Sequence, residues 1–106
     1  MPDIVISNST CLIGLERIGR LDILQKLYGE IVISEAVQRE VGLPHLPWVN
    51  VMAIRNQEAL RFLKFEIDEG EAATIILATE INGALLILDD KKARKIAISI
   101  VVRLPG

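Results

Sequence analysis

Four short runs of β-branched and other aliphatic residues alternate along the chain with longer segments in which apolar residues recur every three or four positions. Such uninterrupted runs are typical of strands that are buried on both faces, whereas the longer spacing predicts amphipathic helices. The predicted strands are residues 4–6, 31–33, 84–88 and 100–102. Because strands and helices alternate, we expect right-handed crossovers and a mostly parallel sheet.

Polar capping residues and glycines mark where the predicted helices begin and end. The clearest helix begins at Asp68, with Glu71 three residues on, and ends before Asn82 and Gly83. The other helices are predicted between Thr10 and Gly19, between Gly19 and Gly29, from Ser34 to Gly42, after Asn56, and from Lys91 to Ser99.

The middle of the chain has a weaker pattern. Residues 42–47 contain a glycine and two prolines and are expected to form a loop. Residues 48–54 fit either an edge strand or irregular structure. The helix after Asn56 is expected to bury Leu60 and Leu63, with Phe62 as a further candidate for burial.

The composition favours one α/β domain that spans residues 1–106. Hydrophobic residues make up 51% of the chain and aromatic residues only 4%, so the apolar mass is mainly aliphatic. That composition suits a central sheet with helices on both faces, and it excludes intrinsic disorder.

The charge and the single cysteine change the picture only slightly. A formal net charge of -2 gives no global support for a nucleic-acid partner, although a local basic cluster can still bind one. Cys11 is the only cysteine, which excludes an intrachain disulfide and favours a reducing compartment. No secretory signal or long apolar span is evident, so we expect a cytoplasmic protein without a membrane segment.

Acidic and amide side chains follow the predicted strands where ligand sites form in parallel sheets. Asn8 and Asp89 each come directly after a strand, Glu71 lies in the first turn of a helix, and Glu40 lies further along the helix after Ser34. Clusters of oxygen ligands bind Mg²⁺ or Mn²⁺, and such a cation can activate water and offset charge on a phosphodiester. We therefore expect a site for a divalent cation at this edge.

Each of these residues also has a purely structural interpretation. Asp68 and Glu71 can form a capping box, Asp90 can cap the helix that follows it, and Glu40 can be a solvated surface charge. The basic residues Lys91, Lys92, Arg94 and Lys95 can form an exposed helix face. A zinc site is not expected, because the chain has one histidine and one cysteine.

The order of these segments resembles that of PIN-domain ribonucleases, in particular the small prokaryotic branch related to the toxins of toxin–antitoxin pairs. The resemblance covers nearly the whole chain, and it rests on residues 4–13, 19–24, 31–37, 40–41, 68–72 and 86–94. It implies a PIN-like three-layer fold and a metal-dependent endoribonuclease that cleaves RNA and is held in check by an antitoxin protein.

The resemblance also implies roles for individual residues. The family's acidic quartet would fall on Asn8, Glu40, Glu71 and Asp89, where Asn8 replaces the aspartate of most relatives. Glu40, Glu71 and Asp89 would bind Mg²⁺ or Mn²⁺. The polar residues expected to support them are Thr10 and Asp90. The residues expected to hold RNA phosphates are Lys91, Lys92, Arg94 and Lys95.

Two alternatives stay open at this point. The chain can be a catalytically inactive PIN-like domain that acts as a binding or dimerisation module, or a small α/β domain whose acids all cap helices. Relatives in this branch usually continue beyond the point where this sequence stops, so the fold is expected to be C-terminally short. A final strand without a covering helix would expose apolar surface, which predicts a homodimer or higher oligomer.

Overall fold

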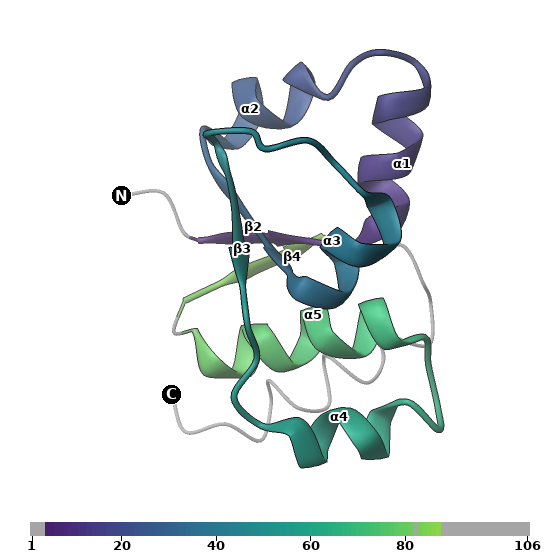
Figure 1. The fold of residues 1–106 in the computed structure, drawn as a ribbon. Helices are drawn as coiled ribbons and strands as arrows, with labels where there is room; N and C mark the ends of the chain where they lie inside the picture. The colour runs from purple at the N-terminus through teal and green to yellow at the C-terminus, as the bar shows by residue number, and fades with distance from the viewer. Residues whose placement is uncertain (1–3, 82, 88–106) are drawn as a thin grey trace.

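The computed structural model describes residues 4–81 and 83–87, which form four strands and five helices (Figure 1). In chain order these elements are β1 (Val5–Ser7), α1 (Ser9–Arg17), α2 (Asp22–Tyr28), β2 (Ile31–Ser34), α3 (Glu35–Val41), β3 (Val49–Met52), α4 (Gln57–Leu63), α5 (Glu69–Glu80) and β4 (Leu85–Ile87).

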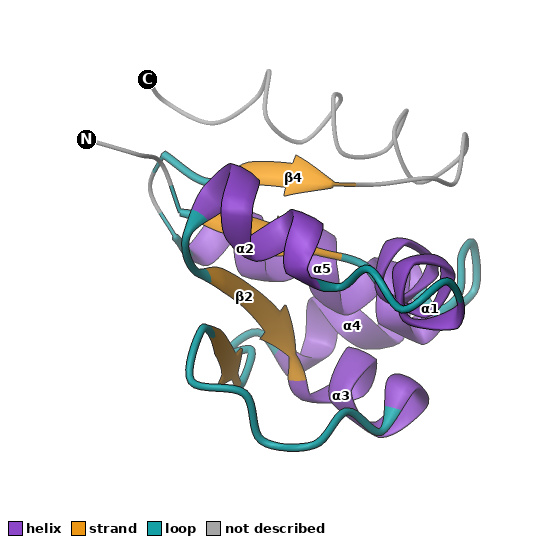
Figure 2. Ribbon diagram, turned by 90° about the horizontal axis from the view of Figure 1, so that it is seen from above, coloured by secondary structure: helices purple, strands orange, loops and turns teal. Residues whose placement is uncertain are grey.

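The four strands form one sheet in the order β3-β2-β1-β4, and every neighbouring pair is parallel. In its centre Ile6 is aligned with Val32, and Val32 with Asn50. Figure 2, which looks down on the sheet, shows β2 and β4 pointing toward the same side of the molecule. The expected parallel sheet is confirmed, and the ambiguous segment at residues 48–54 contains the edge strand β3.

Strand side chains alternate between two hydrophobic clusters, one on each face of the sheet. On one face, strand residues pack with Leu12 of α1, Leu24 of α2 and Val37 of α3. On the other face, the core pairs Ile6 and Val32 with Leu77 of α5. Figure 1 shows α1 and α2 on one side of the sheet and α4 and α5 on the other. The three-layer α/β fold is therefore confirmed.

Four helices begin at the polar residues that the sequence indicates. The side chains of Asn8, Ser34, Asn56 and Asp68 each accept a hydrogen bond from a backbone N–H in the following turn. A cap of this kind typically stabilises a helix by about 1 kcal/mol. Because capping is local chemistry, these starting points can be read from short stretches of sequence.

The helix α5 has the longest buried stretch among the helices of the described chain. Every residue from 70 to 77 is buried, including the polar Thr74, whose hydroxyl donates to the backbone carbonyl of Gly70 at 2.8 Å. The helix packs against the sheet as well as against α3 and α4. Because α5 is enclosed in this way, its first turn has a fixed position beside the sheet.

Two expectations about burial are wrong. The side chain of Phe62 is 76% exposed, while the two leucines of α4 are only partly buried. Phe62 is exposed because α4 turns Leu60 and Leu63 toward α5, which leaves the intervening position on the outer side. Leu85 of β4 is 47% exposed, so this strand is less buried than its apolar run predicts.

The predicted basic helix and the final strand at residues 100–102 lie outside the described residues. The homo-oligomer that was inferred from that strand therefore stays a prediction. Within the described part of the chain, no helix combines the length and the apolar character needed to cross a membrane.

The core contact between α5 and the sheet leads to a prediction about stability. We expect Leu77→Ala to lower the free energy of unfolding by about 2–5 kcal/mol, because it leaves a cavity against Ile6 and Val32. Leu27→Ala is the matched control, since Leu27 is 67% exposed, and it should change stability by less than about 0.5 kcal/mol. Urea unfolding followed by circular dichroism measures both. Equal effects in the two variants would contradict the assigned core.

Candidate active site at the carboxyl ends of the strands

The chain passes from β1 directly into α1 through Asn8, a fully buried residue. The Oδ1 atom of Asn8 accepts a hydrogen bond from the backbone N–H of Cys11 at 3.2 Å, which caps α1. This contact determines the orientation of the amide, because only its oxygen can accept from an N–H. The Nδ2 atom of Asn8 consequently points the other way and donates to Oε1 of Glu71 at 2.9 Å.

Glu71 reaches this position from the first turn of α5, 63 residues further along the chain. Only 6% of its surface is exposed, so its carboxylate has lost most of the water that would solvate its charge. A buried carboxylate requires hydrogen bonds or an opposite charge. The Asn8 amide supplies one hydrogen bond, and the positive end of the α5 dipole also favours the charge.

Glu40 approaches the same turn from α3, and a glycine makes the close approach possible. A Cβ atom on Gly70 would lie 2.9 Å from Oε1 of Glu40 and 3.3 Å from Oδ2 of Asp68. Any larger residue at position 70 would push the Glu40 carboxylate away. The acidic side chain of α3 therefore lies against the residue that precedes Glu71 in the chain.

A hollow of about 460 Å³ opens between α3 and the start of α5. Its walls are formed by Ala36, Arg39, Glu40, Asp68, Glu69 and Gly70. Three of these six residues are carboxylates, and Nη2 of Arg39 lies 3.1 Å from Oε2 of Glu69 at the rim. The hollow thus combines an acidic wall with a cation at its edge.

A family model described as PIN domain matches residues 4–106 of the chain. The chain belongs to the PIN-domain family. The match confirms the resemblance to PIN domains. PIN domains are generally nucleases, which are hydrolases, and they typically use divalent metals. Neither a curated protein nor a solved structure matches the chain.

In this PIN domain, the end of β4 lies beside Asn8. The backbone N–H of Asn8 donates to the carbonyl of Ile87 at 3.2 Å, and Ser7 is aligned with Ile87 in the sheet. The predicted ligand Asp89 and the supporting residue Asp90 follow β4 but lie outside the described residues, as do Lys91, Lys92, Arg94 and Lys95. Their assigned roles stay predictions.

Among the remaining predicted residues, the structure brings Asn8 and Glu71 into direct contact and Glu40 beside Gly70. Thr10 lies exposed in the first turn of α1, two residues after Asn8. The sequence interpretation did not single out Arg39 or Glu69, whose contact spans 30 residues. In the sequence, only their position next to the candidate acids Glu40 and Asp68 could have pointed to Arg39 and Glu69.

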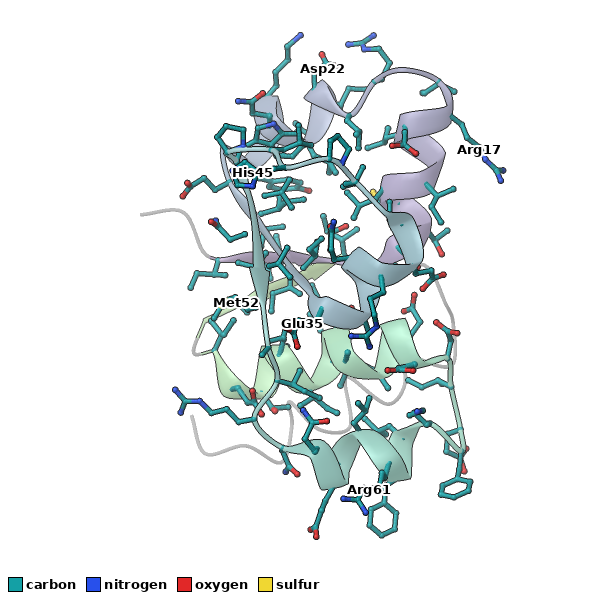
Figure 3. All side chains as sticks on the ribbon, in the orientation of Figure 1. Arg17, Asp22, Glu35, His45, Met52 and Arg61 are labelled. Carbon is teal, nitrogen blue, oxygen red and sulfur yellow. The ribbon has the colours of Figure 1, made fainter. Side chains whose placement is uncertain are left out.

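The histidine His45 and the carboxyl group of Asp22, whose pKa is lowered, both lie away from this site. His45, the single histidine of the chain, lies in the loop near α2 and away from α5 (Figure 3). Hydrogen bonds from Arg20 and then from Lys26 lower the pKa of the exposed Asp22, at the start of α2, to about 2. The groups gathered at the candidate site are the carboxylates of Glu40 and Glu71 and the amide NH2 of Asn8, which donates to Glu71.

The contact between Asn8 and Glu71 predicts how an acidic variant behaves. Asn8→Asp replaces the N–H donor by a second carboxylate facing Glu71, so without metal we expect the free energy of unfolding to fall by about 2 kcal/mol or more. Mn²⁺ should recover this loss by binding between the two carboxylates. Thermal unfolding in EDTA and in millimolar Mn²⁺ measures both effects.

Asn56→Asp is the matched control, because Asn56 also caps a helix but is exposed. It makes the same chemical change without a facing carboxylate, so its stability should depend little on Mn²⁺. Identical behaviour of the two variants in EDTA and in Mn²⁺ would show that Asn8 does not support Glu71.

Proposed function

We propose that this PIN domain is a Mg²⁺- or Mn²⁺-dependent endoribonuclease that hydrolyses RNA phosphodiester bonds. The observation that carries the proposal is the hydrogen bond between Asn8 and Glu71 at the carboxyl end of β1, with Glu40 beside the same turn of α5. Two helices, α3 and α5, thus bring carboxylates close to the edge of a parallel sheet, where ligand sites form in open α/β folds, and Asn8 at the end of β1 hydrogen-bonds one of them. The family match supports a nuclease.

The chemistry of the side chains fits a hard divalent cation. Carboxylate oxygens are preferred by Mg²⁺ and Mn²⁺, and neither sulfur nor imidazole is needed. Within residues 4–81 and 83–87, no group of three His, Cys, Asp or Glu side chains is arranged to hold a metal ion. The proposed set therefore combines Glu40 and Glu71 with Asp89. A bound cation supplies an activated water and offsets negative charge on the scissile phosphate.

The residues of the chain have distinct proposed tasks around that chemistry. Asn8 positions the carboxylate of Glu71 by donating to its Oε1, so that the ligand keeps one orientation. Arg39, at the rim of the hollow, offers a guanidinium to an RNA phosphate. The basic residues Lys91, Lys92, Arg94 and Lys95 are proposed to hold further phosphates, which positions the strand without reading its sequence.

We expect Glu71→Gln and Asp89→Asn each to reduce RNA cleavage at least about 100-fold, because each removes a proposed metal-binding carboxylate, a change worth several kcal/mol. In Glu71→Gln the new amide oxygen can still accept from Asn8, so the fold should be kept. Cleavage of a fluorescent single-stranded RNA in Mn²⁺ measures the effect, and EDTA should abolish it.

Glu30→Gln provides the control, since Glu30 is an exposed acid between α2 and β2, away from the acidic hollow. It should cleave RNA like the unaltered protein. Full activity of Glu71→Gln and Asp89→Asn would mean that the hydrolysis occurs elsewhere or comes from another nuclease.

The family resemblance of the sequence also supports a role as the cytoplasmic toxin of a toxin–antitoxin pair. We expect induced expression in a bacterial host to stop growth, and Glu71→Gln to be harmless at the same protein level, because toxicity would require RNA cleavage. Co-expression of a small protein encoded beside this chain's gene should restore growth. Equal growth inhibition by the active and Glu71→Gln proteins would contradict toxicity by RNA cleavage.

A further inference from the structure

Both phenylalanines of the chain lie on its surface. Phe62 is 76% exposed and Phe65 is 88% exposed, although the chain contains only four aromatic residues in total. A single exposed apolar residue is common on proteins. Two large rings three residues apart, in a chain with so few aromatic residues, form a local feature that the core does not explain.

The rings are held on a hydrogen-bonded turn at the end of α4. The backbone N–H of Phe65 donates to the carbonyl of Phe62 at 3.2 Å, and the N–H groups of Glu66 and Ile67 both donate to the carbonyl of Leu63 at 2.9 Å. Leu63 and Ile67 are partly buried. The inner side of this segment is thus already occupied, and the rings face outward from a backbone with defined hydrogen bonds.

Two cations alternate with the rings. Arg61 precedes Phe62, and Lys64 precedes Phe65. Figure 3 shows Arg61 on the outer side of α4, away from the sheet. We call Arg61, Phe62, Lys64 and Phe65 together the aromatic platform. Because its apolar rings are separated by positive charges, this surface is suited to a partner that has flat aromatic groups and negative charges.

Ion pairs connect the aromatic platform with the acidic hollow of the candidate active site. Nζ of Lys64 lies 3.5 Å from Oε1 of Glu69, and the other oxygen of Glu69 lies 3.1 Å from Nη2 of Arg39. Both pairs are solvent-exposed, so each stabilises the fold only slightly and can be exchanged for a phosphate. Glu69 and Arg39 also line the hollow beside Glu40. Lys64 and Arg39 thus flank Glu69 between the platform and the hollow, where each can bind a phosphate that displaces Glu69.

We propose that the aromatic platform binds single-stranded RNA, with bases stacked on Phe62 and Phe65 and with phosphates bound by Arg61 and Lys64. This inference rests on the proposed function and adds a binding surface outside the cluster of acids. Stacking on aromatic side chains next to cations is how proteins bind single strands without strong sequence preference. A duplex keeps its bases stacked on one another, so it cannot use the rings in this way.

Fluorescence anisotropy with a labelled, unstructured 12-nucleotide RNA in EDTA tests the proposal without cleavage. We expect the double variant F62A/F65A to bind at least about tenfold more weakly, because it removes both rings on which bases would stack. Phe65→Trp should keep the affinity, since tryptophan also stacks. In R61Q/K64Q, the slope of log affinity against log salt should become shallower by about 0.7 for each phosphate that the variant no longer neutralises.

Leu27→Ala is the matched control, because it removes an exposed apolar side chain on α2, outside the platform. It should bind RNA like the unaltered protein. Circular dichroism of all variants shows whether a loss of affinity comes from unfolding, which substitution of such exposed rings should not cause.

Undiminished RNA affinity of F62A/F65A overturns the proposal, and so does an equal loss for a duplex of the same sequence. A change of oligomeric state in light scattering, with unchanged RNA affinity, would assign the rings to a protein interface and also overturn it. Binding that depends on the rings without any metal-dependent cleavage would uphold the platform and reject the proposed function. Cleavage that requires Glu71 but not the rings would uphold the proposed function and reject the platform.

Discussion

A buried carboxylate beside the edge of a parallel sheet imposes the main constraint on this PIN domain. Glu71 is 6% exposed, so groups that the fold brings to it have to hydrogen-bond its carboxylate in place of water. The Asn8 amide does so while its oxygen caps α1. One side chain therefore joins the end of β1, the start of α1 and the first turn of α5. Changing any of these elements would disturb the other two.

The enclosure of α5 explains why the site has a defined shape. The helix is buried from residue 70 to residue 77 and packs against the sheet on one side and against α3 and α4 on others. Its first turn cannot shift without breaking those contacts, because protein interiors are close-packed. Gly70 then gives room for the Glu40 carboxylate. The absence of a side chain at position 70 thereby lets the Glu40 carboxylate lie against the first turn of α5.

The same enclosure separates the two sides of α4. Its leucines turn toward α5, and Phe62 is consequently left in solvent beside Arg61. One side of α4 therefore packs with its leucines, and the other side exposes Phe62 and Arg61 to solvent. The acidic hollow and this outward side adjoin through Glu69, which pairs with both Arg39 and Lys64. The proposed metal-binding acids and the proposed RNA-binding groups therefore lie on separate but adjoining surfaces.

Local chemistry was enough to predict much of the fold. The strands at residues 4–6 and 31–33 are uninterrupted apolar runs, and Ser34 and Asn56 accept from backbone N–H groups only three residues away. Their alternation with helices led to the parallel sheet. The family resemblance correctly indicated a PIN domain. In all these cases the signal lies within a few neighbouring residues or in the order of such segments.

Contacts between distant segments were decided only by the tertiary structure. Asn8 and Glu71 were both singled out in the sequence, but their hydrogen bond across 63 residues depends on how α5 packs beside β1. The sequence likewise could not decide the outward position of Phe62, because a helical pattern shows which residues share a side but not which side meets a neighbour. The sequence by itself therefore indicated most of the described elements, their order and the candidate acids. Packing decided which acids meet and which apolar residues remain in solvent, since both depend on atoms brought together from remote parts of the chain.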